Sequence, residues 1–143
     1  MPIALDASAQ GAANSTSLTY SHTCTGNNLI LFVGVGADAG SDVITGITYN
    51  TVSLTRINFV ASGGAANRSA YLYYLLAPGT GANNVVISRS PLGDIHGESI
   101  SFTDAQQSGV PDASGTNSGS GTNTYITSVT TVADNCWMVS KNT

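Results

Sequence analysis

Charged side chains are scarce in this chain of 143 residues. Asp, Glu, Lys and Arg make up only 8% of it, against roughly 25% in an average soluble domain. Glu98 is the only glutamate and Lys141 the only lysine. Because exposed helices normally carry many of both residues, their near absence favours β-structure over helix.

Basic residues are few and do not cluster in the sequence. The net charge is −4, and the four basic residues are Arg56, Arg68, Arg89 and Lys141. A nucleic-acid-binding surface needs a basic stripe that displaces counterions from phosphates. The sequence therefore predicts no nucleic-acid partner, and it also lacks the basic amphipathic helix of a membrane-surface protein.

Long hydrophobic runs are missing as well. The longest, residues 29–35, is far shorter than the ~20 residues that span a bilayer, so no membrane insertion is expected. Residues 1–6 contain neither the basic nor the apolar region of a signal peptide. We therefore expect either release by cell lysis or a signal that lies outside this sequence.

What the sequence does contain is a series of short apolar runs broken by Gly, Asn, Ser and Pro. This spacing is typical of all-β sandwiches and barrels. We predict one domain over residues 1–143, an antiparallel, jelly-roll-like β-sandwich of about eight or nine strands. The expected strands are residues 18–22, 29–35, 44–49, 52–60, 70–76, 84–89, 96–102, 124–130 and 136–140.

Two of these strands carry further expectations. Residues 29–35 are apolar on both faces and are predicted to form a central strand. Residues 44–49 and 52–60 are separated only by Asn50-Thr51, which predicts a tight hairpin with a positive φ at Asn50.

The C-terminal third is harder to assign. Residues 106–123 are rich in Gly, Ser and Thr without periodicity, and we expect a loop that crosses the surface or packs against a neighbouring subunit. The last expected strand is followed by only three residues. Either the chain is the N-terminal part of a longer protein, or that strand lies at a sheet edge and pairs with another subunit.

Asp94, His96 and Glu98 alternate along an expected strand and so project from one side of it. Two carboxylates and an imidazole on one face can hold a divalent cation; the alternative is a polar strand end near a turn. Glu98 shares its parity with Ile100 and Phe102, which resemble core residues. Either a β-bulge resets the register, or Glu98 lies in a groove, where a carboxylate would suit a sugar-binding site.

Two further pairs are candidates for ligation or cross-linking. Asp38 and Asp42 flank a Gly-containing loop, whose oxygens could bind Ca²⁺ although the full calcium-loop spacing is absent; the alternative is a solvated turn. Cys24 and Cys136 could form one disulfide. Two separate buried thiols fit the sequence equally well.

Tyrosines cluster at Tyr71, Tyr73 and Tyr74. Exposed aromatic rings stack on sugars and anchor interfaces. Tyr71 and Tyr73 are therefore candidate ligand-binding residues together with His96 and Glu98. The alternative, which the composition favours, is a sandwich core with tyrosine hydroxyls at its rim.

Signals of catalysis are weak. The chain has no Gly-x-Ser-x-Gly elbow, phosphate-binding glycine loop, zinc-ligand spacing or dinucleotide fingerprint. A glycosidase would need a second carboxylate to pair with Glu98, and a thiolate site at Cys24 and His22 would need an activating environment. We expect a protein that is not an enzyme.

The order of segments is similar to a known module. Residues 3–6, 17–23 and 29–35, the hairpin at 47–54 and the strand at 71–78 with its glycine turn resemble a β-sandwich module of phage structural proteins and bacterial surface proteins. The similarity covers most of residues 3–102 and weakens after Gln106. It implies a virion surface, or alternatively an extracellular or cell-surface location.

The function expected from these features is that of a virion structural protein. It would be a capsid decoration or head or tail fibre component that acts through buried area and exchanged strands or arms. Homo-oligomers, trimers among them, and other virion proteins would be its partners. The alternative is a carbohydrate-binding module of a tail fibre or a secreted surface protein, with a glycan as ligand.

Overall fold

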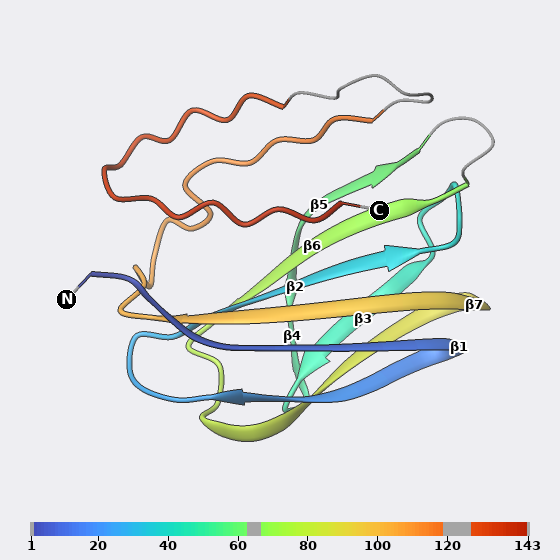
Figure 1. Cartoon of the computed structure of the whole chain (residues 1–143), viewed down its shortest axis with the longest axis horizontal. Helices are drawn as coiled ribbons and strands as arrows, with labels where there is room; N and C mark the ends of the chain where they lie inside the picture. The colour runs from blue at the N-terminus through green and yellow to red at the C-terminus, as the bar shows by residue number, and fades with distance from the viewer. Residues whose placement is uncertain (1, 63–66, 119–126, 143) are drawn as a thin grey trace.

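The computed structural model describes residues 2–62, 67–118 and 127–142, and in these residues it is all-β, without a helix. None of these residues belongs to a helix that could cross a membrane. The strands, labelled in Figure 1, are β1 (Ala4–Cys24), β2 (Ile30–Ala37), β3 (Ile44–Tyr49), β4 (Val52–Ser53), β5 (Thr55–Ala61), β6 (Ser69–Leu76) and β7 (Gly81–Thr103). The prediction of an antiparallel all-β chain is confirmed.

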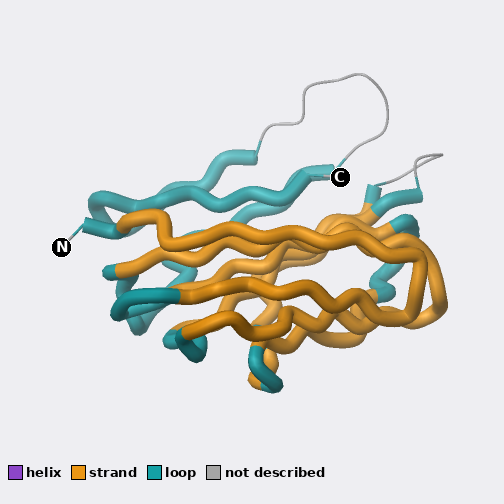
Figure 2. The backbone as a smooth tube through the Cα atoms, turned by 60° about the horizontal axis from the view of Figure 1, so that its bottom comes forward, coloured by secondary structure: helices purple, strands orange, loops and turns teal. Residues whose placement is uncertain are grey.

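The strands form one antiparallel sheet in the order β4-β3-β7-β2-β6-β5, with β1 paired to β7. The long strand β7 is shared: its first half pairs with β3 and its second half with β2, while β1 follows it on the other side. Only Leu54 separates β4 from β5, which lie at the two ends of the strand order. The sheet is therefore nearly closed into a barrel-like shape (Figures 1 and 2).

Several of the expected strands are parts of longer ones. The separate strands predicted at 84–89 and 96–102 are both within β7, and 18–22 is the end of β1. The polar residues that precede 18–22 pair with β7 as far as Ala4. Backbone pairing needs no apolar side chains, so an analysis based on apolar runs could not detect this extension. The predicted hairpin is confirmed, with positive φ at both Asn50 and Thr51.

The main core lies inside the curved sheet. Leu31, Val33 and Val35 of β2 face it and are fully buried, together with Ile87 and Ile95 of β7. The opposite face of β2 presents Ile30, Phe32, Gly34 and Gly36, and we call this side of the sheet the outer face. Since β2 lies between β6 and β7 and is buried on both sides, its predicted central position is confirmed.

A second, smaller apolar cluster covers part of the outer face. Ile30 and Phe102 form its centre, and Val139 packs against it from residues 127–142, which we call the C-terminal segment. The Trp137 ring meets the Phe102 ring edge-on at 5.1 Å between centroids. Figure 2 shows this segment running along one side of the sheet.

The C-terminal segment contains no strand, which corrects the strand predicted at 136–140 and the described part of that at 124–130. Its alternating apolar residues pack on the sheet through side chains without joining the hydrogen-bonded ladder. Asp112 accepts hydrogen bonds from the Val132 amide at 2.7 Å and the Ala133 amide at 3.4 Å. The described part of the predicted 106–123 loop therefore contacts its own chain, while residues 119–126 lie outside the described residues.

Candidate functional site

Asp94, His96 and Glu98 project from the outer face of β7, and all three are exposed. The pairing of β7 with β2 runs without a shift from Phe102 to Ile95, so no bulge resets this side of the strand. Glu98 and Phe102 therefore share one face. Near Phe102 this face is apolar and is covered by the C-terminal segment. At Glu98 it is polar and exposed to solvent.

Lys141 is a site residue that the sequence did not suggest. Its side chain lies over Gly34, with Cδ only 3.1 Å from where a Cβ on that glycine would stand. The ammonium reaches Glu98 Oε1 at 3.2 Å, and the Lys141 side chain is 12% exposed against 58% for Glu98. The sequence feature that could have indicated this contact is the pair Gly34 and Gly36 within an apolar strand. Such glycines often mark the close approach of another segment.

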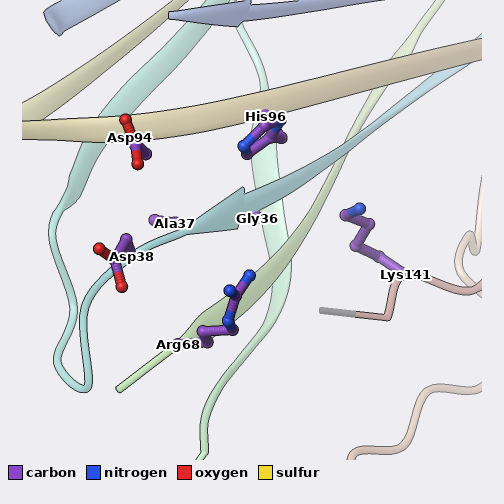
Figure 3. Close-up of a pocket in the computed structure, with 7 residues that line it drawn as sticks. All are labelled: Gly36, Ala37, Asp38, Arg68, Asp94, His96 and Lys141. Atoms are coloured by element: carbon purple, nitrogen blue, oxygen red, sulfur yellow. The ribbon is translucent and has the colours of Figure 1, made fainter. Parts of the chain in front are cut away.

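A hollow of ≈140 Å³ lies at the end of β2, lined by Gly36, Ala37, Asp38, Arg68, Asp94, His96 and Lys141. Figure 3 shows Asp38 and Asp94 on one side of it, and His96, Arg68 and Lys141 around the rest. The hollow thus has an acidic side and a basic side.

The position of Asp94 is fixed by its neighbours. Arg89 is buried and donates hydrogen bonds to the carbonyl oxygens of Asp94 at 2.6 Å and Pro91 at 2.8 Å. Asn14 of β1 donates to the Asp94 carboxylate at 2.6 Å. Since these contacts hold both the backbone and the side chain, Asp94 is preorganised at the rim of the hollow.

A second hollow, of ≈320 Å³, lies on the other side of His96 and is lined by Gln10, Gly11, Ala12, His96, Gly97 and Glu98. Gln10 and Ala12 come from β1, whose register sets them opposite Glu98 and His96. The two hollows therefore share His96 and together cross the outer face from β1 to the C-terminal segment.

The candidate metal ligands are dispersed. Asp42 forms an ion pair with Arg56 at 2.7 Å, whereas Asp38 lines the first hollow. The two aspartates therefore have different neighbours and do not face one common ligand site. Glu98 is paired with Lys141 and Asp94 with Asn14. Among the residues that the structure describes, no three His, Cys, Asp or Glu side chains come together in a group that could hold a metal ion.

The candidate tyrosines face the interior. Tyr71 pairs with Val35 and Tyr73 with Val33, and the two tyrosines are 1% and 5% exposed. The Tyr71 hydroxyl accepts a hydrogen bond from the Val43 amide at 2.8 Å. Neither ring can stack against a ligand in this arrangement, which corrects their assignment to a binding groove in favour of the core alternative.

The cysteines are not joined. Cys24 is buried and Cys136 is exposed, and both are free thiols. Burial raises the pKa of Cys24, only partly offset by hydrogen bonds with Tyr49 and Ser101. A thiol that resists ionisation is a poor nucleophile, so the arrangement gives no support to a thiolate site.

A buried polar network around His22 was not foreseen from the sequence. The ring nitrogens Nε2 and Nδ1 lie 2.9 Å from the hydroxyls of Ser101 and Ser99. Ser101 in turn donates to Asp6 at 2.7 Å. His22 and both serines are buried, so no substrate can reach them, and Asp6 contacts Ser101 rather than the imidazole. The network stabilises the interior and is not a nucleophilic triad.

Comparison with known proteins finds no family model that matches the chain, and no match among curated proteins or solved structures. The interpretation of the outer face therefore rests on its own geometry.

Proposed function

We propose that this protein is a non-enzymatic structural protein of a phage virion, a capsid decoration or head or tail fibre component that acts through subunit contacts. The observation that carries the proposal is the apolar character of the C-terminal segment. Four of the seven large apolar side chains exposed in the described residues lie there, and Val132 and Met138 are 86% and 87% exposed. Exposed apolar side chains concentrated in one segment support a contact with another protein surface.

The way in which the C-terminal segment is held also supports this function. It packs on the outer face through Trp137, Val139 and Lys141, without hydrogen-bonded pairing to a strand. Such a segment can shift to meet a neighbouring subunit without breaking any strand pairing of the sheet. Closed homo-oligomers, trimers included, would bury the exposed apolar groups. The similarity to phage and surface modules adds the expectation of a virion surface.

The test has two parts. Particles produced by the natural genome that encodes this chain are banded on a density gradient and probed with an antibody; we expect the protein to sediment with intact particles. Sedimentation velocity of the purified chain should show an oligomer. Changing Val132 and Met138 to Ser should weaken it, whereas Val52→Ser with Leu92→Ser, which are exposed elsewhere, should not. A monomeric chain absent from the particles would contradict the proposal.

A second function, recognition of a carbohydrate by a tail fibre or surface protein, is favoured by one specific observation. Two hollows flank His96 on an open face, and polar side chains of Gln10, Glu98 and Asp94 line them. Convergent polar groups in a surface hollow are what a sugar requires of its binder. A glycan array should give a reproducible signal that Glu98→Gln reduces; an array without any signal counts against this function.

A further inference from the structure

Charge is concentrated at the first hollow. Four of its seven lining residues, Asp38, Asp94, Arg68 and Lys141, are charged, in a chain of which only 8% is charged. They come from separate parts of the sequence, so the concentration is produced by folding. Because charged side chains are scarce in this chain, a hollow lined by four of them is a candidate site for a charged ligand.

On the basic side of the hollow, Lys141 is paired with Glu98, whereas the Arg68 guanidinium has no partner among the described residues. No hydrogen bond or ion pair of the Arg68 guanidinium is found among the described residues; only its backbone is bonded, to Ser62. Lys141 Nζ and His96 Cβ lie 3.9 and 4.0 Å from where a Cβ on Gly36 would stand. Lys141 and His96 thus lie beside Gly36, which has no side chain to fill the hollow, and Arg68 lines the same hollow. A guanidinium in such a setting binds a carboxylate through paired hydrogen bonds.

The acidic side limits which anion fits. The carboxylates of Asp38 and Asp94 line the hollow opposite the cations, and ionised carboxylates only accept hydrogen bonds. A small inorganic anion would be repelled by them, and a neutral sugar would gain no ion pair with Arg68. A ligand with one carboxylate and several hydroxyl groups satisfies both sides.

We infer that this hollow binds the carboxylate-bearing unit of an acidic glycan, a uronic acid, and this inference rests on the second function proposed above. Arg68 holds the carboxylate, Lys141, which also pairs with Glu98, adds a second positive charge beside it, and Asp38 and Asp94 accept hydrogen bonds from ring hydroxyls. The ≈140 Å³ hollow is smaller than the ~300–1,000 Å³ sites of drug-sized ligands, as suits a single sugar unit. The neighbouring ≈320 Å³ hollow beyond His96 takes the next unit along the glycan.

The experiment titrates the whole chain with digalacturonic acid and follows binding by NMR chemical shifts. Because the site is open, we expect saturable binding with Kd on the order of 1 mM, weakened by added salt. Arg68→Gln and Lys141→Gln should each raise Kd roughly tenfold or more, since each removes a charged hydrogen-bond donor. The matched control is Arg56→Gln, because that guanidinium is paired with Asp42 and does not line the hollow.

Each alternative outcome has a distinct meaning. If galactobiose, the neutral counterpart, binds as well as digalacturonic acid, the inference is overturned while carbohydrate recognition survives. If inorganic phosphate competes at equal strength, the hollow is a simple anion site and the inference fails. If neither sugar binds, the inference is overturned, and the glycan array described above decides on carbohydrate recognition separately. Lys141→Gln could also loosen the C-terminal segment, so Arg68→Gln decides: unchanged affinity in that variant overturns the inference.

Discussion

At the scale of single residues, the half-buried Tyr20 and the fully buried Tyr49 differ in how their hydroxyls are satisfied. The Tyr20 hydroxyl is buried beside the Ser99 hydroxyl, but it makes no hydrogen bond of regular geometry among the described residues. The Tyr49 hydroxyl lies 3.2 Å from the carbonyl oxygens of both His22 and Gly81. An unsatisfied buried polar group is a cost to the folded state, whereas a satisfied one contributes to stability.

Tyr20→Phe and Tyr49→Phe should therefore change the free energy of unfolding in opposite directions. We expect Tyr20→Phe to leave it unchanged or raise it by up to about 1 kcal/mol, and Tyr49→Phe to lower it by about 1 kcal/mol. Urea unfolding of the two variants beside the parent chain measures both. A Tyr20→Phe variant as destabilised as Tyr49→Phe would show that the Tyr20 hydroxyl is bonded after all.

At the scale of elements, two glycines of β2 differ in how closely the C-terminal segment approaches them. A Cβ on Gly34 would stand 3.1 Å from the Lys141 stem, whereas the nearest atom to a Cβ on Gly36 would be 3.8 Å away. Gly34→Ala should displace Lys141 and loosen the segment, while Gly36→Ala should be accommodated.

Trp137, the only tryptophan, reports this difference because its ring packs against Phe102. In Gly34→Ala we expect its fluorescence emission to shift to longer wavelength and the segment to become more sensitive to protease. In Gly36→Ala both should match the parent chain. Identical behaviour of the two variants would contradict the close packing of Lys141 over Gly34.

The elements also show what the sequence could and could not predict. Apolar runs and turn residues were enough for the all-β class, the Asn50-Thr51 hairpin and the outward alternation of Asp94, His96 and Glu98. They left two alternatives where both faces of a strand are apolar, because parity then cannot tell which face is interior; for Tyr71 and Tyr73 the structure shows the core alternative and not the candidate ligand site. They failed at 136–140, where apolar alternation serves side-chain packing instead of strand pairing.

The first hollow could not be foreseen for a different reason. Lys141 and Glu98 are 43 positions apart, and Arg68 comes from a third part of the chain. Their meeting depends on the sheet order and on where the C-terminal segment lies, neither of which local patterns encode. The sequence identified His96 and Glu98 on one face, but not the cations that join them.

At the scale of the whole molecule, the buried network predicts how stability depends on pH. Burial lowers the pKa of His22 below its ordinary value of 6.5, against a smaller opposing effect of the Asp6 carboxylate. Burial alone would raise the pKa of Asp6, but hydrogen bonds from Thr25 and Ser101 outweigh it and hold the pKa below 3.8.

Both pKa shifts lower the free energy of unfolding as the pH falls. Below pH 6.5 the unfolded chain gains a proton at His22 that the folded chain resists, so the free energy of unfolding falls. The stabilisation from ionised Asp6 is present above 3.8 and is lost as pH falls through its lower folded pKa. Urea unfolding from pH 7.5 to 3 should show two successive losses.

Variants separate the two losses. His22→Gln should remove the loss below pH 6.5 and Asp6→Asn the one below 3.8, whatever their effect on absolute stability. His96→Gln is the control for removing an imidazole, because His96 is exposed. An unchanged slope between pH 7 and 5 in His22→Gln would exclude His22 as the group responsible.

The pairing of β1 with β7 has a consequence for the order of events during synthesis. Asp6 and Ser101, which hydrogen-bond across these strands, are 95 positions apart, so β1 leaves the ribosome long before β7, the strand with which it pairs in the described residues, exists. Contacts between such distant segments form slowly, and unpaired strands are prone to aggregate. Residues 7–17 of β1 consist of Ala, Ser, Gln, Gly, Asn and Thr. Because none of these side chains is large and apolar, the unpaired nascent strand stays soluble until β7 has been synthesised.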